Sequence, residues 1–396
     1  MTVGEPNGSV DGRWFAVGRS DEQDPARAGE AATSEALAGD DAKLLVVFCS
    51  NSGDLGAMLE AINERSGGVP LIGCSTAGEI TSGGPGDAGV VVAAFGGDGF
   101  TVHTAMADNA SADLRGAGAI VAGSMQHVAA CPHRVMLLLT DGLAGDQQEI
   151  VRGAYSVLGA SVPLVGGCAG YDQKWQASAQ LHGDRVLAGA VVAAAIGSDA
   201  PLGIGVRHGW QPIGEPVLVT RSANNRIYTL DDRPALDVYF ERFDPPAEAR
   251  VDQNAFTRFA ATHPIGLSSR TGEPHVRMVG AADFDDGWMG FIAEVPQGRM
   301  AWFMEGGYDS VLEAPDAACA AALAPLDGVA PLGMLTFDCI ARRQILGEDG
   351  SGAAIARVSK SAGGAPVAGF YTYGEIARTH GQSGFHNQTL VVLAVG

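Results

Sequence analysis

Positive charge is scarce in this sequence. Its 396 residues include 25 Lys and Arg against 45 Asp and Glu, which gives a formal net charge of −20 at pH 7. A chain of this sign repels nucleic acids and anionic membranes, so the sequence predicts neither as a partner. A negative surface also keeps any protein dissolved, so the charge alone points to no particular ligand.

Long apolar runs and secretion signals are also missing. The longest apolar stretch, Leu187–Gly197, is too short to span a membrane and predicts a buried strand instead. Residues 1–10 contain neither a basic segment nor an apolar core, so no signal peptide is expected. We therefore expect a cytoplasmic protein. The preference for Arg over Lys, with abundant Ala and Gly, suggests a bacterial source.

Cysteine is too sparse for a disulfide framework. The six cysteines are expected to be free thiols in a reducing compartment. No C-x-x-C or H-x₃-H spacing occurs, and such spacings are typical of zinc sites. The sequence therefore predicts no metal site.

What the sequence does contain is an internal repeat. Gly73–Ile80 and Gly369–Ile376 both match G-x-x-T-x-G-E-I, and Gly166–Asp172 is a weaker copy. Each copy follows a short strand-like segment that begins with Pro. Repetition of this kind indicates one supersecondary unit used three times.

Around each loop the pattern predicts a strand, a helix, a second strand, the Gly-rich loop and a last strand. In copy one Asp54 is the expected N-cap of a helix whose apolar residues fall on one stripe. Copies two and three each have a His before the last strand, His182 and His386. The predicted ranges are Leu44–Phe48, Asp54–Arg65, Val69–Ile72 and Gly89–Phe95 in copy one; Arg134–Leu139, Gly145–Leu158, Val162–Val165 and Leu187–Ala195 in copy two; and Gly333–Phe337, Gly352–Ser361, Pro366–Ala368 and Thr389–Ala394 in copy three.

The fold class predicted from these elements is mixed α/β (α+β), with helices that cover sheets containing antiparallel pairs. Residues 1–12 are expected to be disordered. A series of antiparallel strands begins near Pro201, with a hairpin turn at Asn224 and Asn225. We therefore divide the chain into one domain at residues 13–200 and a second at residues 201–396.

Four segments in this order resemble the FIST family: Gly73–Ile80, Val165–Asp172, Arg221–Leu236 and Gly369–Leu393. The resemblance runs from about Trp14 to the last residue and implies a FIST N domain followed by a FIST C domain. It further implies an intracellular sensor that binds a small, amino-acid-like ligand and signals in trans to a partner protein. Some members resemble haem proteins that sense nitric oxide and regulate a histidine kinase, which leaves haem as an alternative cofactor.

The Gly-rich loops are the first candidate ligand site. In α/β proteins ligands bind beyond the carboxyl ends of parallel strands, where these loops are expected to lie. Glu79 and Glu375 would bind an ammonium group, and the hydroxyls of Thr76 and Thr372 would orient it. The alternative is that Gly, Thr and Glu only encode the same tight turn each time.

The C-terminal copy is the better candidate, because aromatic residues replace the small residues of copy one. An Arg beside an acidic residue would suit an amino-acid-like zwitterion. The alternative is that Arg342 and Asp338 form a structural ion pair. The residues expected to line this pocket are Asp338, Cys339, Arg342, Tyr371, Tyr373, Glu375, His386 and Asn387.

Cysteine and histidine leave two further possibilities open. Cys74 and Cys168 lie in the loops and would contact a ligand, pack in the core or act as nucleophiles of a cysteine-dependent enzyme. No G-x-S-x-G elbow occurs, and we expect no enzyme. If haem is bound, His182 or His386 would be the axial ligand. Otherwise we expect no cofactor.

Overall fold

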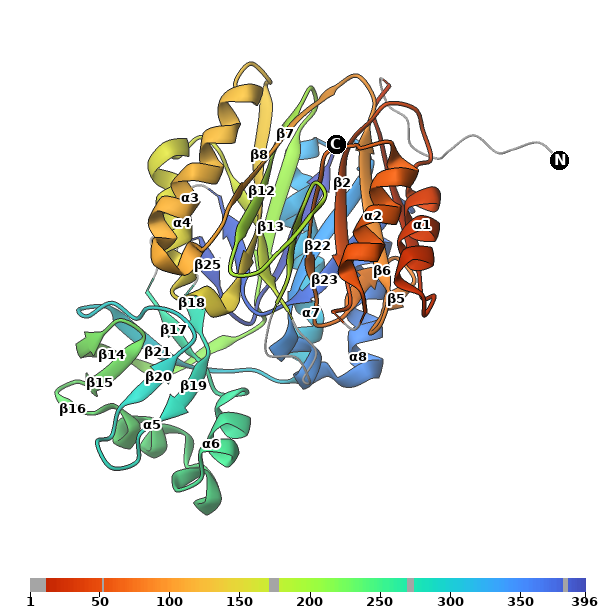
Figure 1. Ribbon diagram of the computed structural model, residues 1–396. Helices are drawn as coiled ribbons and strands as arrows, with labels where there is room; N and C mark the ends of the chain where they lie inside the picture. Colours follow the sequence, from red (N-terminus) through yellow and green to blue (C-terminus); the bar gives the residue numbers. More distant parts are fainter. Residues whose placement is uncertain (1–11, 52, 171–177, 269–273, 380–383) are drawn as a thin grey trace.

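The computed structural model describes residues 12–51, 53–170, 178–268, 274–379 and 384–396. The described strands form four sheets. Three six-stranded sheets make up a body, and an eight-stranded sheet belongs to a unit inserted between residues 207 and 308 (Figure 1). Residues 1–11 of the expected disordered start lie outside the described residues, as do Tyr171 and Asp172 of the second loop. The fold is mixed α+β, as predicted.

The element order of the body runs through one pattern three times. Repeat one comprises β1 (Trp14–Ser20), α1 (Pro25–Ala36), β2 (Ala42–Cys49), α2 (Leu55–Ser66), β3 (Leu71–Ser75), β4 (Glu79–Thr81), β5 (Gly84–Pro85) and β6 (Val90–Gly96). Repeat two comprises β7 (Phe100–Ala107), α3 (Leu114–Ala122), β8 (His133–Asp141), α4 (Gln147–Leu158), β9 (Leu164–Ala169), β10 (Gln180–His182), β11 (Arg185–Leu187) and β12 (Val191–Ser198). Repeat three comprises β13 (Leu202–Arg207), α7 (Tyr308–Leu323), β22 (Gly333–Cys339), α8 (Ile340–Ser361), β23 (Val367–Thr372), β24 (Glu375–Arg378), β25 (Phe385–His386) and β26 (Leu390–Val395).

Each repeat is longer than the unit proposed from the sequence. It opens with an additional strand and helix, and in repeat two these are β7 and α3, which the sequence analysis did not predict. The α3 sequence, LRGAGAIVA, is short and rich in small residues, so its apolar stripe is weak. Its N-cap is clear in the structure, where the Asp113 carboxylate accepts the Gly116 N–H at 2.8 Å.

The three sheets exchange strands in a cycle. The strand after the Gly-rich loop leaves its own repeat: β4 pairs with β23 of repeat three, β10 with β3 of repeat one, and β24 with β9 of repeat two. The sheet orders are β1-β6-β2-β3-β10-β11, β7-β12-β8-β9-β24-β25 and β13-β26-β22-β23-β4-β5. The division at residue 200 stays a prediction, although two of these sheets contain strands from both sides of it.

The register assigns equivalent positions to the three repeats. Gly73, Gly166 and Gly369 all sit on the second strand of the parallel pair, opposite Val47, Leu138 and Thr336. A Cβ added at Gly166 or Gly369 would lie 1.9 Å from the carbonyl oxygen of the facing strand. Because real Cβ atoms never approach so closely, the packing requires glycine there. The repeated glycines of the loop motif thus begin inside the strand.

Helices and strands pack in two layers around a shared core. Large side chains from all three sheets, among them Phe48, Leu137 and Phe337, meet in one buried cluster between the sheets. The helix pairs α1–α2, α3–α4 and α7–α8 cover the outer faces, and Figure 1 shows the first two pairs on opposite sides of the body. As predicted, Asp54 caps α2, and Met58, Leu59 and Ile62 of the predicted stripe are buried.

The inserted unit, residues 211–305, has its own core. Its sheet contacts the helices α5 and α6, and aromatic side chains such as Tyr239, Phe256 and Phe303 fill the space between them. In Figure 1 the unit projects from one end of the body. Its elements are β14 (Gln211–Ala223), β15 (Arg226–Leu230), β16 (Arg233–Pro234), α5 (Ala235–Phe243), α6 (Gln253–Ala260), β17 (Ile265–Leu267), β18 (His275–Arg277), β19 (Val279–Ala282), β20 (Met289–Phe291) and β21 (Met300–Glu305).

Candidate functional site

The Thr and Glu of the loop motif bond to each other. In repeat one the Thr76 hydroxyl donates to Glu79 Oε1 at 2.6 Å, and in repeat three the Thr372 hydroxyl donates to Glu375 Oε1 at 2.5 Å. The same hydroxyls accept the N–H groups of Gly78 and Gly374. The i to i+3 spacing of Thr and Glu is therefore the spacing that closes the turn.

The second carboxylate oxygen ties the loop to the last strand of the repeat. Glu79 Oε2 accepts the Gly89 N–H at 3.2 Å, and Glu375 Oε2 accepts both the N–H and the hydroxyl of Thr389, at 3.1 and 2.9 Å. These bonds give the turn interpretation a physical basis, because both carboxylates are buried and engaged within the protein. A ligand-binding role for Glu79, Glu375, Thr76 and Thr372 stays a prediction.

Burial dominates the electrostatics of these carboxyl groups. It raises the pKa of Glu375 to about 7, although the hydrogen bonds from Thr372 and Thr389 oppose the rise. Burial also raises the pKa of Glu79, against hydrogen bonds from Thr76 and Gly89. Glu375 can therefore change its charge near neutral pH, which an exposed Glu does not do.

The strand that opens the third copy ends in a buried ion pair. Arg342 Nε donates to Asp338 Oδ1 at 2.6 Å, and both side chains are inaccessible to solvent. A second guanidinium nitrogen, Nη1, donates to the His208 carbonyl at 3.3 Å. Of the two interpretations of this pair, the structure thus shows the ion pair. Arg342 Nη2 has no hydrogen-bond partner among the described residues, so one donor is left over.

The two tyrosines of the third copy face different repeats. Tyr371 is buried, and its backbone exchanges hydrogen bonds with Ala77 and Gly78 of repeat one. Arg343 lies over its ring, with the guanidinium carbon 4.8 Å from the ring centroid. The Tyr373 N–H instead donates to the Cys168 carbonyl of repeat two. The structure therefore does not gather both tyrosines into one aromatic wall.

The loop cysteines are buried thiols. Cys168 Sγ accepts the Thr140 hydroxyl at 3.3 Å, and burial raises the pKa of Cys168 to about 12. Burial also raises the pKa values of Cys74 and Cys339 well above the ordinary range. Catalytic cysteines require a lowered pKa and access to substrate, and these thiols have neither feature.

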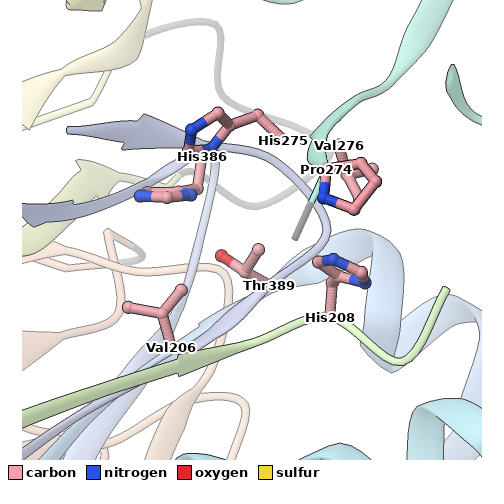
Figure 2. Close-up of a pocket in the computed structure, with 7 residues that line it drawn as sticks. All are labelled: Val206, His208, Pro274, His275, Val276, His386 and Thr389. Carbon is pink, nitrogen blue, oxygen red and sulfur yellow. The ribbon is translucent and has the colours of Figure 1, made fainter. Parts of the chain in front are cut away.

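A small cavity lies where the inserted unit meets repeat three (Figure 2). His208, which follows β13, and His386 of β25 belong to the body, whereas His275 of β18 belongs to the inserted unit. The cavity offers about 20 Å³ to the centre of a water-sized sphere, which is room for about one water molecule. Val206, Pro274, Val276 and Thr389 complete its lining.

The three cavity histidines are held in the neutral form. His386 Nε2 donates to the Ala377 carbonyl at 2.8 Å, so its Nδ1 is left as an acceptor. Burial lowers the pKa of His208 and of His275 to about 4, and that of His386 to about 3. Neighbouring cations add to the effect on each ring; they are Arg207, Arg277, Arg299 and Arg342.

The cavity is connected to the loop residues through Thr389. Thr389 lines the cavity, and its hydroxyl donates to Glu375. His386 lies opposite Glu375 in the β24–β25 register. The neighbouring Asn387 is buried, and its Oδ1 has no hydrogen-bond partner among the described residues. Of the residues predicted for the third copy, Glu375, His386 and Asn387 therefore lie at or beside the cavity.

Comparison with family models decides the relationship of the chain. Residues 43–233 match the model of the FIST N domain, and residues 235–378 match that of the FIST C domain. The chain belongs to the FIST family. FIST domains are associated with the sensing of small ligands in signal transduction. A search of curated proteins found no match.

In this FIST chain neither expected iron ligand is placed for haem. His386 is bonded to Ala377 and faces a cavity that holds about one water, which leaves no space for a macrocycle. His182 lies in β10 among the charged groups of Arg185, Asp108 and Asp184, whereas haem requires an apolar pocket. The two histidines are also not equivalent, because the register places Leu187 of repeat two where His386 stands in repeat three.

Two cavity residues of the FIST chain were missed as ligand-site candidates from its sequence, His208 and His275. They lie 67 residues apart and share no motif, so no sequence signal joins them. The described residues contain no group of three side chains arranged to hold a metal ion. No helix among them is long and apolar enough to cross a membrane.

Proposed function

We propose that this FIST protein senses a small, amino-acid-like molecule at the boundary between repeat three and the inserted unit. The observation that carries the proposal is the composition of the cavity wall. His275 comes from the inserted unit, whereas His208, His386 and Thr389 come from the body. A molecule bound there contacts both parts at once, so its binding depends on how they are arranged.

The chemistry of the cavity favours a zwitterion. The free acceptor of His386 suits an ammonium group, whereas the surrounding guanidinium groups favour a carboxylate. The buried Arg277 contributes to this field and keeps a cationic side chain, although burial lowers its pKa to about 10. An uncharged ligand would leave one of these preferences unmet.

A ligand larger than water can enter only if the inserted unit shifts. The contacts that hold the unit at this boundary are few and polar. Gln388 Nε2 donates to the Ala261 carbonyl at 2.7 Å, and Arg277 Nη1 donates to the Phe385 carbonyl at 3.3 Å. On repeat two Arg152 pairs with Glu294. Polar boundaries of this kind rearrange more readily than apolar ones, so the closed form would be the ligand-free state.

The signal would pass to a separate protein, such as a histidine kinase. The support is the family relationship together with the movable unit, which offers a surface whose position depends on the ligand. We propose no catalytic step, because the loop thiols are buried and protonated. The loops themselves would then hold the sheets together.

The test is a thermal-shift and calorimetry screen with glycine, alanine, glutamate and acetate. We expect at least one amino acid to stabilise the protein, and His275→Ala and His386→Ala to abolish that stabilisation. His133→Ala in β8 is the matched control and should keep it. If Tyr373→Ala abolishes binding while the cavity variants bind normally, the site lies at the aromatic loop instead and the proposed location is wrong.

A further inference from the structure

Two arginines lie stacked on aromatic rings on one face of the inserted sheet. The guanidinium carbon of Arg221 is 4.6 Å from the Tyr228 ring centroid, and that of Arg226 is 4.3 Å from the Trp288 ring centroid. β14, β15 and β20 are neighbours in the sheet, so both stacks share one surface. We call these four residues the stacked-arginine face.

The stacked-arginine face points away from the core of the unit. Ile227 and Leu230 of β15 are fully buried, and side chains alternate along a strand, so Arg226 and Tyr228 point outward. Arg221 and Arg226 are exposed, whereas Tyr228 and Trp288 are half-buried. In Figure 1 this part of the sheet lies at the end of the unit farthest from the body.

The charges of this face are not used inside the protein. Within the described part of the chain neither Arg221 nor Arg226 forms an ion pair, whereas Arg233 nearby pairs with Glu241. The hairpin is held by its backbone pairing and by the buried side chains on the other face. A ring beneath a guanidinium fixes its plane and leaves its edge N–H groups free, which is the arrangement that binds a carboxylate through two hydrogen bonds.

We propose that the stacked-arginine face docks a short acidic segment of a partner protein. Tyr, Trp and Arg are the residue types that carry most binding energy at protein interfaces. The chain as a whole has a net charge of −20, so an acidic segment is repelled from most of the surface and directed to this face. Exposed Asp residues on the flanking turns repel a long polyanion such as nucleic acid and limit the segment to a few residues; they are Asp231, Asp232, Asp285 and Asp286.

The docking surface stands on its own geometry and rests on the proposed function only for its role as the output. The face lies on the same unit that supplies His275 to the cavity. A shift of that unit on ligand binding would move the docked segment relative to the body. The two proposals can fail separately, because acidic-peptide binding requires no ligand.

The experiment uses the full chain and a fluorescein-labelled hexaglutamate peptide, with anisotropy read at low and moderate salt. We expect Arg221→Ala and Arg226→Ala each to weaken binding about tenfold, the usual effect of losing one charge-assisted pair. Arg226→Lys should also weaken it, because lysine keeps the charge but loses the stack and the fork. Arg258→Ala removes the same charge from an exposed site on α6 and should bind like the wild type.

Circular dichroism of each variant verifies that the fold is kept. Equal binding by Arg226→Ala and Arg258→Ala, or no binding of the peptide by the wild type, would overturn the proposal. A six-nucleotide single-stranded DNA that binds as tightly as the peptide would also overturn it, in favour of a general anion site. A failed ligand screen with a positive peptide result would remove the proposed sensing site and leave the docking surface.

Discussion

Glu79 and Glu375 occupy the same position in two different repeats, 296 residues apart. Each accepts a hydroxyl from the Thr three residues before it and a backbone N–H from the residue that precedes the last strand of its repeat. The register places Gln180 at the third equivalent position. Its Oε1 accepts the Ala190 N–H at 3.1 Å, and its Nε2 donates to Ser178 Oγ at 3.0 Å. An amide therefore already performs this role in the same fold.

Glu375→Gln should remove a pH dependence of stability. The folded pKa of Glu375 is raised from 4.5 to about 7, so its contribution is fully present below pH 4.5 and is lost as the pH rises through 7. The whole effect is about 3 kcal/mol at 1.36 kcal/mol per pKa unit. Urea unfolding between pH 5 and 8 should show a flatter stability profile for Glu375→Gln than for the wild type.

Gln180→Glu provides the reverse experiment. It places a carboxyl group where repeat two has an amide, and Ala190 and Ser178 supply the same kinds of donor that Glu375 receives. We expect this variant to lose stability as the pH rises toward 8. If the pH profile of Glu375→Gln remains parallel to that of the wild type, the carboxyl group does not titrate in this range.

The histidine cavity should give a pH dependence of the opposite sign. The folded pKa values of His208, His275 and His386 are lowered to about 4, 4 and 3, so the stability they support is present above pH 6.5 and is lost as the pH falls toward 4. We expect hydrogen exchange to show the inserted unit opening first on acidification, because His275 connects it to the body.

His275→Gln keeps a polar side chain that cannot be protonated in this range. It should reduce the acid sensitivity of the inserted unit, whereas His133→Gln, outside the cavity, should leave it unchanged. Identical opening in wild type and His275→Gln between pH 7 and 5 would show that other groups govern the boundary.

Arg342→Ala should be strongly destabilising. Removing the guanidinium leaves Asp338 buried without its partner, and broken buried pairs typically lower the unfolding free energy by about 3–5 kcal/mol. The double variant Asp338→Leu with Arg342→Met removes both charges and should lose far less. Chemical denaturation of the single and double variants measures the coupling, and additive losses would mean that the two side chains do not depend on each other.

Gly369→Ala should disturb the parallel pair of repeat three. The added methyl group would lie 1.9 Å from the Thr336 carbonyl oxygen, and overpacking of this kind costs about 1–3 kcal/mol or more. Gly352→Ala in α8 is the matched control, because no atom lies within 4 Å of its Cβ position. Alanine favours a helix over glycine, so the control should gain about 0.5–1 kcal/mol. Thermal unfolding of both variants compares the two effects.

Local pattern predicted much of the fold. The Pro-led strands, the Asp54 cap and the stripe of α2 are encoded within a few residues of one another, and the structure contains them. The α3 helix and the β7 strand were missed, because small residues give α3 almost no apolar stripe. The strand exchange was missed for a different reason. A strand such as β4 reads the same whether its partner is β3 or β23, since pairing partners leave no periodic mark.

The candidate site shows the same division. The Thr-to-Glu spacing was visible in the sequence because both residues lie in one turn, although the sequence could not decide between a turn and a ligand site. The cavity was not visible, because His208, His275 and His386 come from three distant segments and meet only when the inserted unit packs on the body.

The sequence by itself determined the family, the mixed α+β class, the repeated loop and the acidic surface, because composition and short-range spacing carry each of them. Only the tertiary structure decided which repeat each strand joins, that Arg342 is paired with Asp338, and that three neutral histidines share one cavity. These features depend on hydrogen bonds and desolvation between residues far apart in the chain, and such interactions exist only after the sheets have closed around their common core.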